Sequence, residues 1–125
     1  MTLVLDAGAL VAYEKGDRTV RAFLEHAQRD GLDVRTTTAV VAQVWRDGAR
    51  QARLAMLLRG VDEIELTRAE CRRIGSLLGH ASGRDVPDAS VVAAAADGDE
   101  ILTSDPDDIR MLAEASGKNL IVTPI

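Results

Sequence analysis

The pattern of hydrophobic and polar positions predicts strands and helices that follow one another along the whole chain. Short apolar or β-branched runs, bounded by turn residues, predict strands at residues 2–5, 34–37, 64–66, 101–103 and 120–123. The segments between them predict helices at residues 8–13, 17–29, 38–45 and 51–58, and further helices after Thr67, Asp85 and Asp105. Strands that alternate with helices are typical of a parallel sheet covered by helices, so the fold class is α/β.

Residues that begin and end helices support this division. Thr67 is followed by Glu70 at the position of a capping box, and Pro87 lies in the first turn of the helix that Asp85 caps. Gly117 ends the helix that begins after Asp105. The length of 125 residues predicts one domain that spans residues 1–125.

Composition and charge limit the kinds of partner. Hydrophobic residues make up 46% of the chain but aromatic residues only 2%, so aliphatic side chains must fill the core. The net charge of −5 argues against a protein that coats nucleic acid by bulk charge. The charge is unevenly distributed, however. Residues 81–125 hold nine acids and three bases, whereas residues 41–80 hold seven arginines and five acids. This division suits a metal site that must also hold a polyanion.

Cysteine, histidine and hydropathy exclude several other classes of protein. The single cysteine, Cys71, forms no internal disulfide, and its helical context favours a small apolar role in a cytoplasmic protein. His26 and His80 lie far apart and lack zinc-ligand spacing. No apolar run approaches the length of a membrane span, so we expect no membrane partner.

Aspartates lie where an α/β fold would place a ligand site. Asp6 directly follows the first predicted strand, Asp105 follows the fourth, and Asp88 stands before a run of apolar helical residues. Carboxyl ends of parallel strands share one edge of the sheet, and carboxylate oxygens are the ligands that hard divalent cations prefer. A bound cation would lower the pKa of a water and stabilise charge on a phosphate. The pattern therefore favours a metal-dependent phosphodiesterase.

Helix capping is the alternative explanation of these acids. Asp6, Asp85 and Asp105 each stand at a helix start, where a carboxylate accepts backbone hydrogen bonds. Capping needs only one acid per helix, yet Asp85 is followed by Asp88 and Asp105 by Asp108. The doubled acids favour the metal site, because like charges gathered at one edge repel unless a cation neutralises them.

Three segments in order resemble the PIN domain, and most of all the VapC-type toxins of bacterial toxin–antitoxin pairs. They are LVLDAGAL at residues 3–10, DASVVAAA at 88–95 and LTSDPDDI at 102–109. The resemblance implies a three-layer α/β/α sandwich with a five-stranded parallel sheet. It also implies a Mg²⁺- or Mn²⁺-dependent ribonuclease that cleaves RNA, is usually a homodimer and is silenced by a VapB-like antitoxin.

The resemblance also assigns roles to individual residues. Asp6, Asp88 and Asp105 match the catalytic acids that bind the metal, and Asp108 matches a frequent further metal-binding acid. Thr103 matches a hydroxyl that supports the site. We expect Asp85 to be a supporting acid as well, because it precedes Asp88 by three residues.

Position 43 departs from the family pattern. The family has a glutamate on the helix after the second strand, where this chain has Gln43, so Gln43 would support the site through its carbonyl oxygen but add no charge. We expect weaker metal binding, which Asp47, one helical turn further on, could partly offset. The alternative function is a PIN-like RNA- or protein-binding module with weakened or lost catalysis.

Three arginines form the candidate RNA-binding group. Arg46, Arg50 and Arg53 recur at a spacing that places them on one face of a helix, beside Gln43. They could hold RNA phosphates, or form a solvated stripe paired with nearby acids. The nearby Trp45 fits a core or interface anchor better than a base-stacking platform. The apolar helix at residues 52–58 could receive an antitoxin helix or a second subunit.

A phospho-acceptor receiver domain is the second alternative, because receiver domains also gather aspartates at strand ends. The acceptor aspartate should end a middle strand, but the third predicted strand runs into Glu65, Leu66 and Thr67 instead. The sequence therefore disfavours this alternative.

Overall fold

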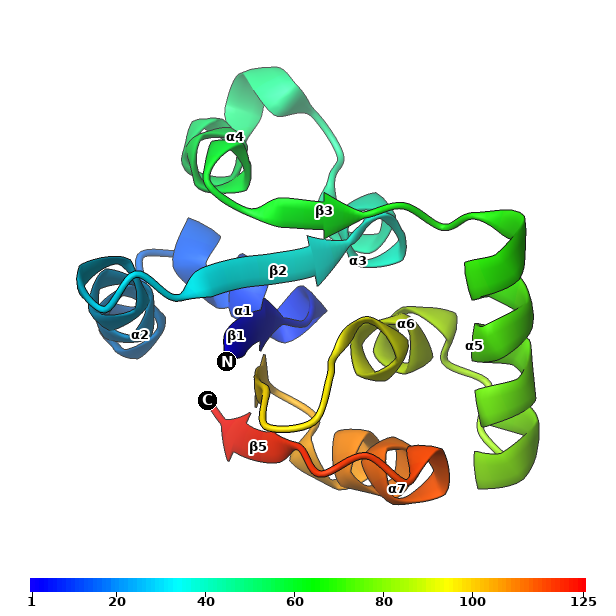
Figure 1. The fold of residues 1–125 in the computed structure, drawn as a ribbon. Coiled ribbons are helices and arrows are strands. Elements are labelled where there is room, and N and C mark those ends of the chain that lie inside the picture. Colours follow the sequence, from blue (N-terminus) through cyan, green and yellow to red (C-terminus); the bar gives the residue numbers. More distant parts are fainter.

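The computed structural model describes residues 1–125 and contains one sheet of five strands, all of them parallel. The strands lie in the order β3-β2-β1-β4-β5 across the sheet (Figure 1). They are β1 (Thr2–Leu5), β2 (Asp33–Thr37), β3 (Asp62–Ile64), β4 (Glu100–Thr103) and β5 (Ile121–Pro124). The expected α/β fold with a five-stranded parallel sheet is confirmed.

Seven α-helices cover the sheet and form two groups (Figure 1). In the first group α1 contacts α2, α3 and α4, in the second α5, α6 and α7 contact one another, and α3 also contacts α6. The helices are α1 (Ala7–Glu14), α2 (Arg18–Arg29), α3 (Thr38–Val44), α4 (Ala52–Arg59), α5 (Arg68–Ala81), α6 (Val86–Ala94) and α7 (Pro106–Ser116). The arrangement is the expected α/β/α sandwich. None of these helices combines the length and the apolar character that a bilayer span requires.

The order of the strands brings three strand ends together. Strand β1 lies between β2 and β4, with Leu3 paired to both Val34 and Glu100. From β1 the chain continues to β2 and β3 on one side of the sheet, and then crosses to β4 and β5 on the other side. The direction in which strands are added therefore reverses between β1 and β4. Open α/β sheets bind ligands at such a reversal, beyond the carboxyl ends of the strands. This order also excludes the receiver-domain alternative, whose strands follow the order 2-1-3-4-5.

Aliphatic side chains fill the core, as the composition requires. Eighteen buried residues form one continuous cluster. Leu5 and Leu102 from the central strands, Leu10 from α1 and Ile109 from α7 are fully buried in it. The core therefore lies directly beneath the carboxyl ends of β1 and β4 and fixes the backbone there.

Two predicted elements are wrong in detail. The third strand ends at Ile64, two residues earlier than predicted, because pairing with β2 places Asp62 opposite Arg35. The helix predicted at residues 38–45 ends at Val44, since Trp45 is extended with ψ of 129°. A short 3-10 helix, Gly48–Arg50, follows before α4 begins. This interruption affects the candidate RNA-binding arginines.

Candidate functional site

Asp6 occupies the central position of the carboxyl edge. It follows β1 and is only 2% exposed. One carboxylate oxygen accepts a hydrogen bond of 2.8 Å from the amide of Ala9, so Asp6 caps α1, and the other accepts one of 3.3 Å from the amide of Ser104. Burial raises the pKa of Asp6, while hydrogen bonds from Thr103, Ala9 and Ser104 oppose the rise. The carboxylate is thus held rigidly between α1 and the end of β4.

Thr103 connects two of the acids. Its hydroxyl hydrogen-bonds Asp6 and accepts a bond of 2.8 Å from the amide of Asp105. The side chain is fully buried at the last position of β4, one residue after Leu102, which pairs with Leu5 at the end of β1. Thr103 therefore fixes Asp6 and the backbone of Asp105 relative to each other.

Gly8 allows α1 to approach the end of β4. A Cβ atom at this position would overlap the Cβ and Oγ atoms of Ser104. The close approach lets the Ser104 amide reach Asp6, because both residues lie where α1 and β4 meet. The glycine is therefore a steric requirement of the site.

Asp88 is the second buried acid. It lies in the first turn of α6, where the Asp85 carboxylate caps the helix by accepting a 2.9 Å bond from the Asp88 amide. The Asp88 side chain, 8% exposed, is therefore not the cap. Burial, and then repulsion by Asp85, Asp6, Asp105 and Asp108, raises the pKa of Asp88 from 3.8 to about 7. These repulsions show that the sequence-predicted acids gather in one region.

Two exposed acids complete this region, which we call the acidic edge (Asp6, Asp85, Asp88, Asp105 and Asp108). Asp105 occupies the N-cap position of α7, but its side chain makes no capping hydrogen bond. Capping therefore does not explain Asp105, whereas it does explain Asp85. Asp108 lines a cleft together with Asp85 and Asp88.

The acidic edge offers carboxylate oxygens but no assembled metal cage. No group of three or more His, Cys, Asp or Glu side chains is positioned to hold a metal ion by itself. The donor chemistry nevertheless fits a hard divalent cation, because every candidate ligand is a carboxylate. Burial, and to a lesser degree repulsion by neighbouring acids, raises the pKa of Asp6 and of Asp88, and a positive charge would oppose both shifts. A cation is the kind of ligand that would supply it.

Two buried hydroxyls that the sequence analysis missed hold α6 in place. Thr37, at the end of β2, lies 2.7 Å from the Ser90 hydroxyl, which itself donates to the carbonyl of Pro87. Thr37 also caps α3 by accepting a bond of 3.2 Å from the Val40 amide. This chain of bonds connects the first turn of α6, and with it Asp88, to the sheet. The only sign of this bond in the sequence is Ser90, a serine within a run of apolar helical residues.

Gln43 lies on α3 and is exposed, near the end of the helix. Because α3 ends at Val44, Asp47 does not lie one helical turn beyond Gln43, and that expectation is wrong. Asp47 instead caps the 3-10 helix through a 3.1 Å bond from the Ala49 amide.

The arginines predicted to share one helix face lie on three different segments. Arg46 follows α3 and donates to the carbonyls of Ala42 and Trp45. Arg50 ends the 3-10 helix and lies 3.7 Å from Asp47. Arg53 belongs to α4 and donates to the carbonyl of Glu14. The helix is interrupted after Val44 because the buried Gln51 side chain binds the backbone there. Its carbonyl oxygen accepts hydrogen bonds from the amides of residues 46 and 47.

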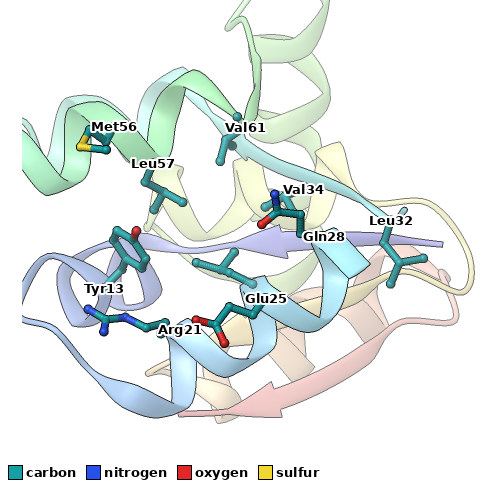
Figure 2. Close-up of a pocket in the computed structure, with 11 residues that line it drawn as sticks. Tyr13, Arg21, Glu25, Gln28, Leu32, Val34, Met56, Leu57 and Val61 are labelled. Carbon is teal, nitrogen blue, oxygen red and sulfur yellow. The ribbon is translucent and has the colours of Figure 1, made fainter. Parts of the chain in front are cut away.

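Two hollows are relevant to binding. A cleft of about 160 Å³ adjoins the acidic edge. Its walls come from the end of α5, the start of α6 and the first half of α7: Leu78, Gly83, Arg84, Asp85, Asp88, Asp108, Met111 and Leu112. A larger groove of about 630 Å³ lies elsewhere, between α2 and α4 (Figure 2). The larger groove contains none of the predicted catalytic acids.

Comparison with known proteins supports the fold. No protein-family model matches the chain, and no curated protein matches it. Among solved structures, the chain is similar to one in the crystal structure of VapBC2 from Rickettsia felis bound to a DNA fragment from their promoter. The TM-score is 0.72 at 15% sequence identity, over 100% of this chain and 99% of the other. The chain therefore shares, over its whole length, the fold of a VapBC2 component.

Proposed function

We propose that this chain is a Mg²⁺- or Mn²⁺-dependent endoribonuclease, the toxin of a VapBC-type toxin–antitoxin pair. The observation that carries the proposal is Asp88, a buried carboxylate that four other acids of the acidic edge repel. A fold gains no stability from such an arrangement, so a bound cation is its best explanation. The structural similarity to VapBC2 over the whole chain supports the same class.

The acids of the acidic edge would hold the cation. Asp6, Asp88, Asp105 and Asp108 are the proposed ligands, and a bound cation would supply a water of lowered pKa and stabilise charge on the scissile phosphate. The Ala9 and Ser104 amides and the Thr103 hydroxyl fix the Asp6 carboxylate in one orientation. A ligand held in this way needs little rearrangement when the cation binds.

RNA cleavage tests the proposal directly. The purified protein should cleave single-stranded RNA with Mg²⁺ or Mn²⁺ and not in chelator. Asp6→Asn should abolish cleavage while circular dichroism shows a retained fold. Asp33→Asn, the same change at an exposed residue at the start of β2, is the matched control and should leave cleavage intact. Full activity of folded Asp6→Asn, or equal activity in chelator, would contradict the proposed chemistry.

A PIN-like binding module without catalysis is the second candidate. Gln43 favours it, because this position brings no charge to the site, and no three acids form a ready cation site. Calorimetry with Mn²⁺ separates the two candidates. A catalytic site should bind Mn²⁺ with an affinity that Asp88→Asn lowers, whereas a module without catalysis should show no binding that depends on Asp88.

The groove between α2 and α4 is the proposed docking surface for a VapB-like antitoxin. Figure 2 shows Tyr13, Leu57 and Val61 facing this groove, with Met56 on its rim. Met56 is 67% exposed, more than any other large apolar side chain of the protein. An amphipathic helix or extended segment of a partner would cover these residues.

Co-expression tests this surface. We expect a VapB-like antitoxin that is co-expressed with the chain to co-purify with it and to inhibit cleavage. Met56→Glu should weaken that complex without reducing cleavage, and Leu66→Glu, an exposed apolar residue outside the groove, is the control. If Met56→Glu and Leu66→Glu weakened the complex equally, the antitoxin would not bind in this groove. Light scattering of the free chain tests the proposed homodimer.

A further inference from the structure

The cleft beside the acidic edge combines apolar and charged walls. Leu78, Met111 and Leu112 form its apolar side, and Asp85, Asp88 and Asp108 form its acidic side. Met111 is 44% exposed although it stands next to the predicted catalytic acids. A cation site alone gives no reason for an exposed thioether at this place, because hard cations prefer oxygen ligands. The cleft therefore has a feature that the proposed metal site does not explain.

Arg84 is the one basic residue that lines this cleft. Three carboxylates line the same small space, yet Arg84 forms none of the five salt bridges in the structure. By contrast, Arg50, Arg73 and Arg110 each pair with an acid three residues away. The exposed Arg84 guanidinium thus keeps its hydrogen-bond donors free at the edge of the cleft.

The turn before Arg84 is fixed by its backbone conformation. Ser82 has φ of 55° and is the only residue other than glycine in the left-handed region. The amide of Gly83 donates to the carbonyl of Leu78, which closes the end of α5. A Cβ at Gly83 would come within 3.3 Å of the Leu78 side chain, so a larger residue would press on the cleft wall. Ser82 is the C-cap of α5, and a left-handed residue at this place is a common way for a helix to end.

We propose that this cleft binds the nucleotide next to the scissile phosphate of single-stranded RNA, with Arg84 on a phosphate and the base against Met111. This inference rests on the proposed ribonuclease function and assigns a substrate subsite to it. Arg84 would be a substrate-binding residue and Met111 part of the wall that contacts the base. A guanidinium offers paired donors to a phosphate, and a thioether packs well against an aromatic ring.

The charges of the cleft favour a nucleotide over a simple anion. The three acids repel a free phosphate, and Arg84 alone offsets only part of that repulsion. A ligand that also buries an apolar ring against Leu78 and Met111 gains the additional free energy that a bare anion lacks. An unpaired nucleotide has both groups in one molecule, and single-stranded RNA exposes its bases for such contacts.

A titration followed by amide NMR tests the cleft without any need for catalysis. Uridine 5′-monophosphate and adenosine 5′-monophosphate, in the presence of Mg²⁺, should shift the amide signals of residues 82–85 and 111–112. Uridine alone and inorganic phosphate alone should bind at least about tenfold more weakly, because each lacks one of the two contacts. Shifts centred elsewhere, or phosphate binding as tight as the nucleotides, would overturn the proposal.

Three variants test the named residues. Arg84→Gln should weaken nucleotide binding about tenfold or more, and Met111→Ala by several-fold. Arg110→Gln is the matched control: it removes the same charge one residue from Met111, but Arg110 does not line the cleft. Arg84→Gln should raise KM for RNA with little change in kcat, because the contact is made before and during the reaction. If Arg84→Gln and Arg110→Gln weakened nucleotide binding equally, the effect would come from the net charge of the protein and not from a contact with Arg84. That result would overturn the assignment.

The two proposals fail in different ways. If the parent protein cleaves no RNA but binds nucleotides through Arg84, the cleft assignment stands and the ribonuclease does not. If the parent cleaves RNA and Arg84→Gln changes neither KM nor nucleotide binding, the ribonuclease stands and the cleft assignment fails.

Discussion

Replacing Asp88 by asparagine should stabilise the metal-free protein at neutral and higher pH. The carboxylate is buried, and four acids repel it, so its pKa is raised from 3.8 to about 7. The folded state therefore holds a proton on Asp88 over the range from about pH 4 to 7 in which the unfolded chain has lost it. Linkage then requires that the free energy of unfolding of the parent falls as the pH rises through this range, and levels off above it.

The size of the effect follows from the pKa. A rise from 3.8 to about 7 corresponds to about 4 kcal/mol. The adjoining cleft admits water that screens the charge, so we expect about 2 kcal/mol at pH 8. For a chain of this length that is a gain of roughly 8 °C in Tm. Below pH 4 the two proteins should be equally stable on this account, because Asp88 is then protonated in both states.

Urea unfolding in chelator between pH 4 and 8 measures this prediction. Asp88→Asn should show a flatter dependence on pH than the parent, and Asp33→Asn should follow the parent. Adding Mn²⁺ at pH 8 should stabilise the parent more than the variant, by mass action on the folded state. A variant that is no more stable than the parent at pH 8 would show that Asp88 is not a buried charge among the acids.

Three other changes test the supports of the site. Gly8→Ala should cost about 1–3 kcal/mol of unfolding free energy, because the new methyl group overlaps Ser104; urea unfolding measures the loss, and an unchanged midpoint would refute the close approach. Gln51→Leu should cost about 2–4 kcal/mol and speed hydrogen exchange at the amides of residues 46 and 47, because both lose their acceptor. Gln43→Glu should tighten Mn²⁺ binding in calorimetry and give equal or lower stability in chelator; an unchanged affinity would show that position 43 does not face the cation.

The strand-end acids could be predicted because local sequence determines them. Asp6 follows a short apolar run, and in a parallel sheet such a position must lie at the carboxyl edge. Asp105 follows by the same reasoning from β4. The order of the strands was then enough to bring both acids to one place, without knowledge of any side-chain contact.

The features that were missed depend on contacts between distant residues. The helical spacing of Arg46, Arg50 and Arg53 gave no sign that the Gln51 side chain would bind the intervening backbone and end α3 early. The bond between Thr37 and Ser90 joins residues 53 positions apart, and hydrophobic periodicity records no such pairing. The boundaries of β3 likewise depend on its register with β2.

Hydrogen bonds and core packing hold the acids of the acidic edge close together, although their negative charges repel one another. Repulsion would drive Asp88 away from Asp6, but Asp88 lies on a helix that Asp85 caps and that Ser90 and Thr37 fasten to the sheet. These hydrogen bonds and the aliphatic core thus stabilise the backbone, while the carboxylates keep their repulsion. Stored repulsion of this kind increases the free energy that a cation gains on binding, since binding removes it. The same supports would keep the acids together after the cation leaves, so the site should not need to refold for each binding event.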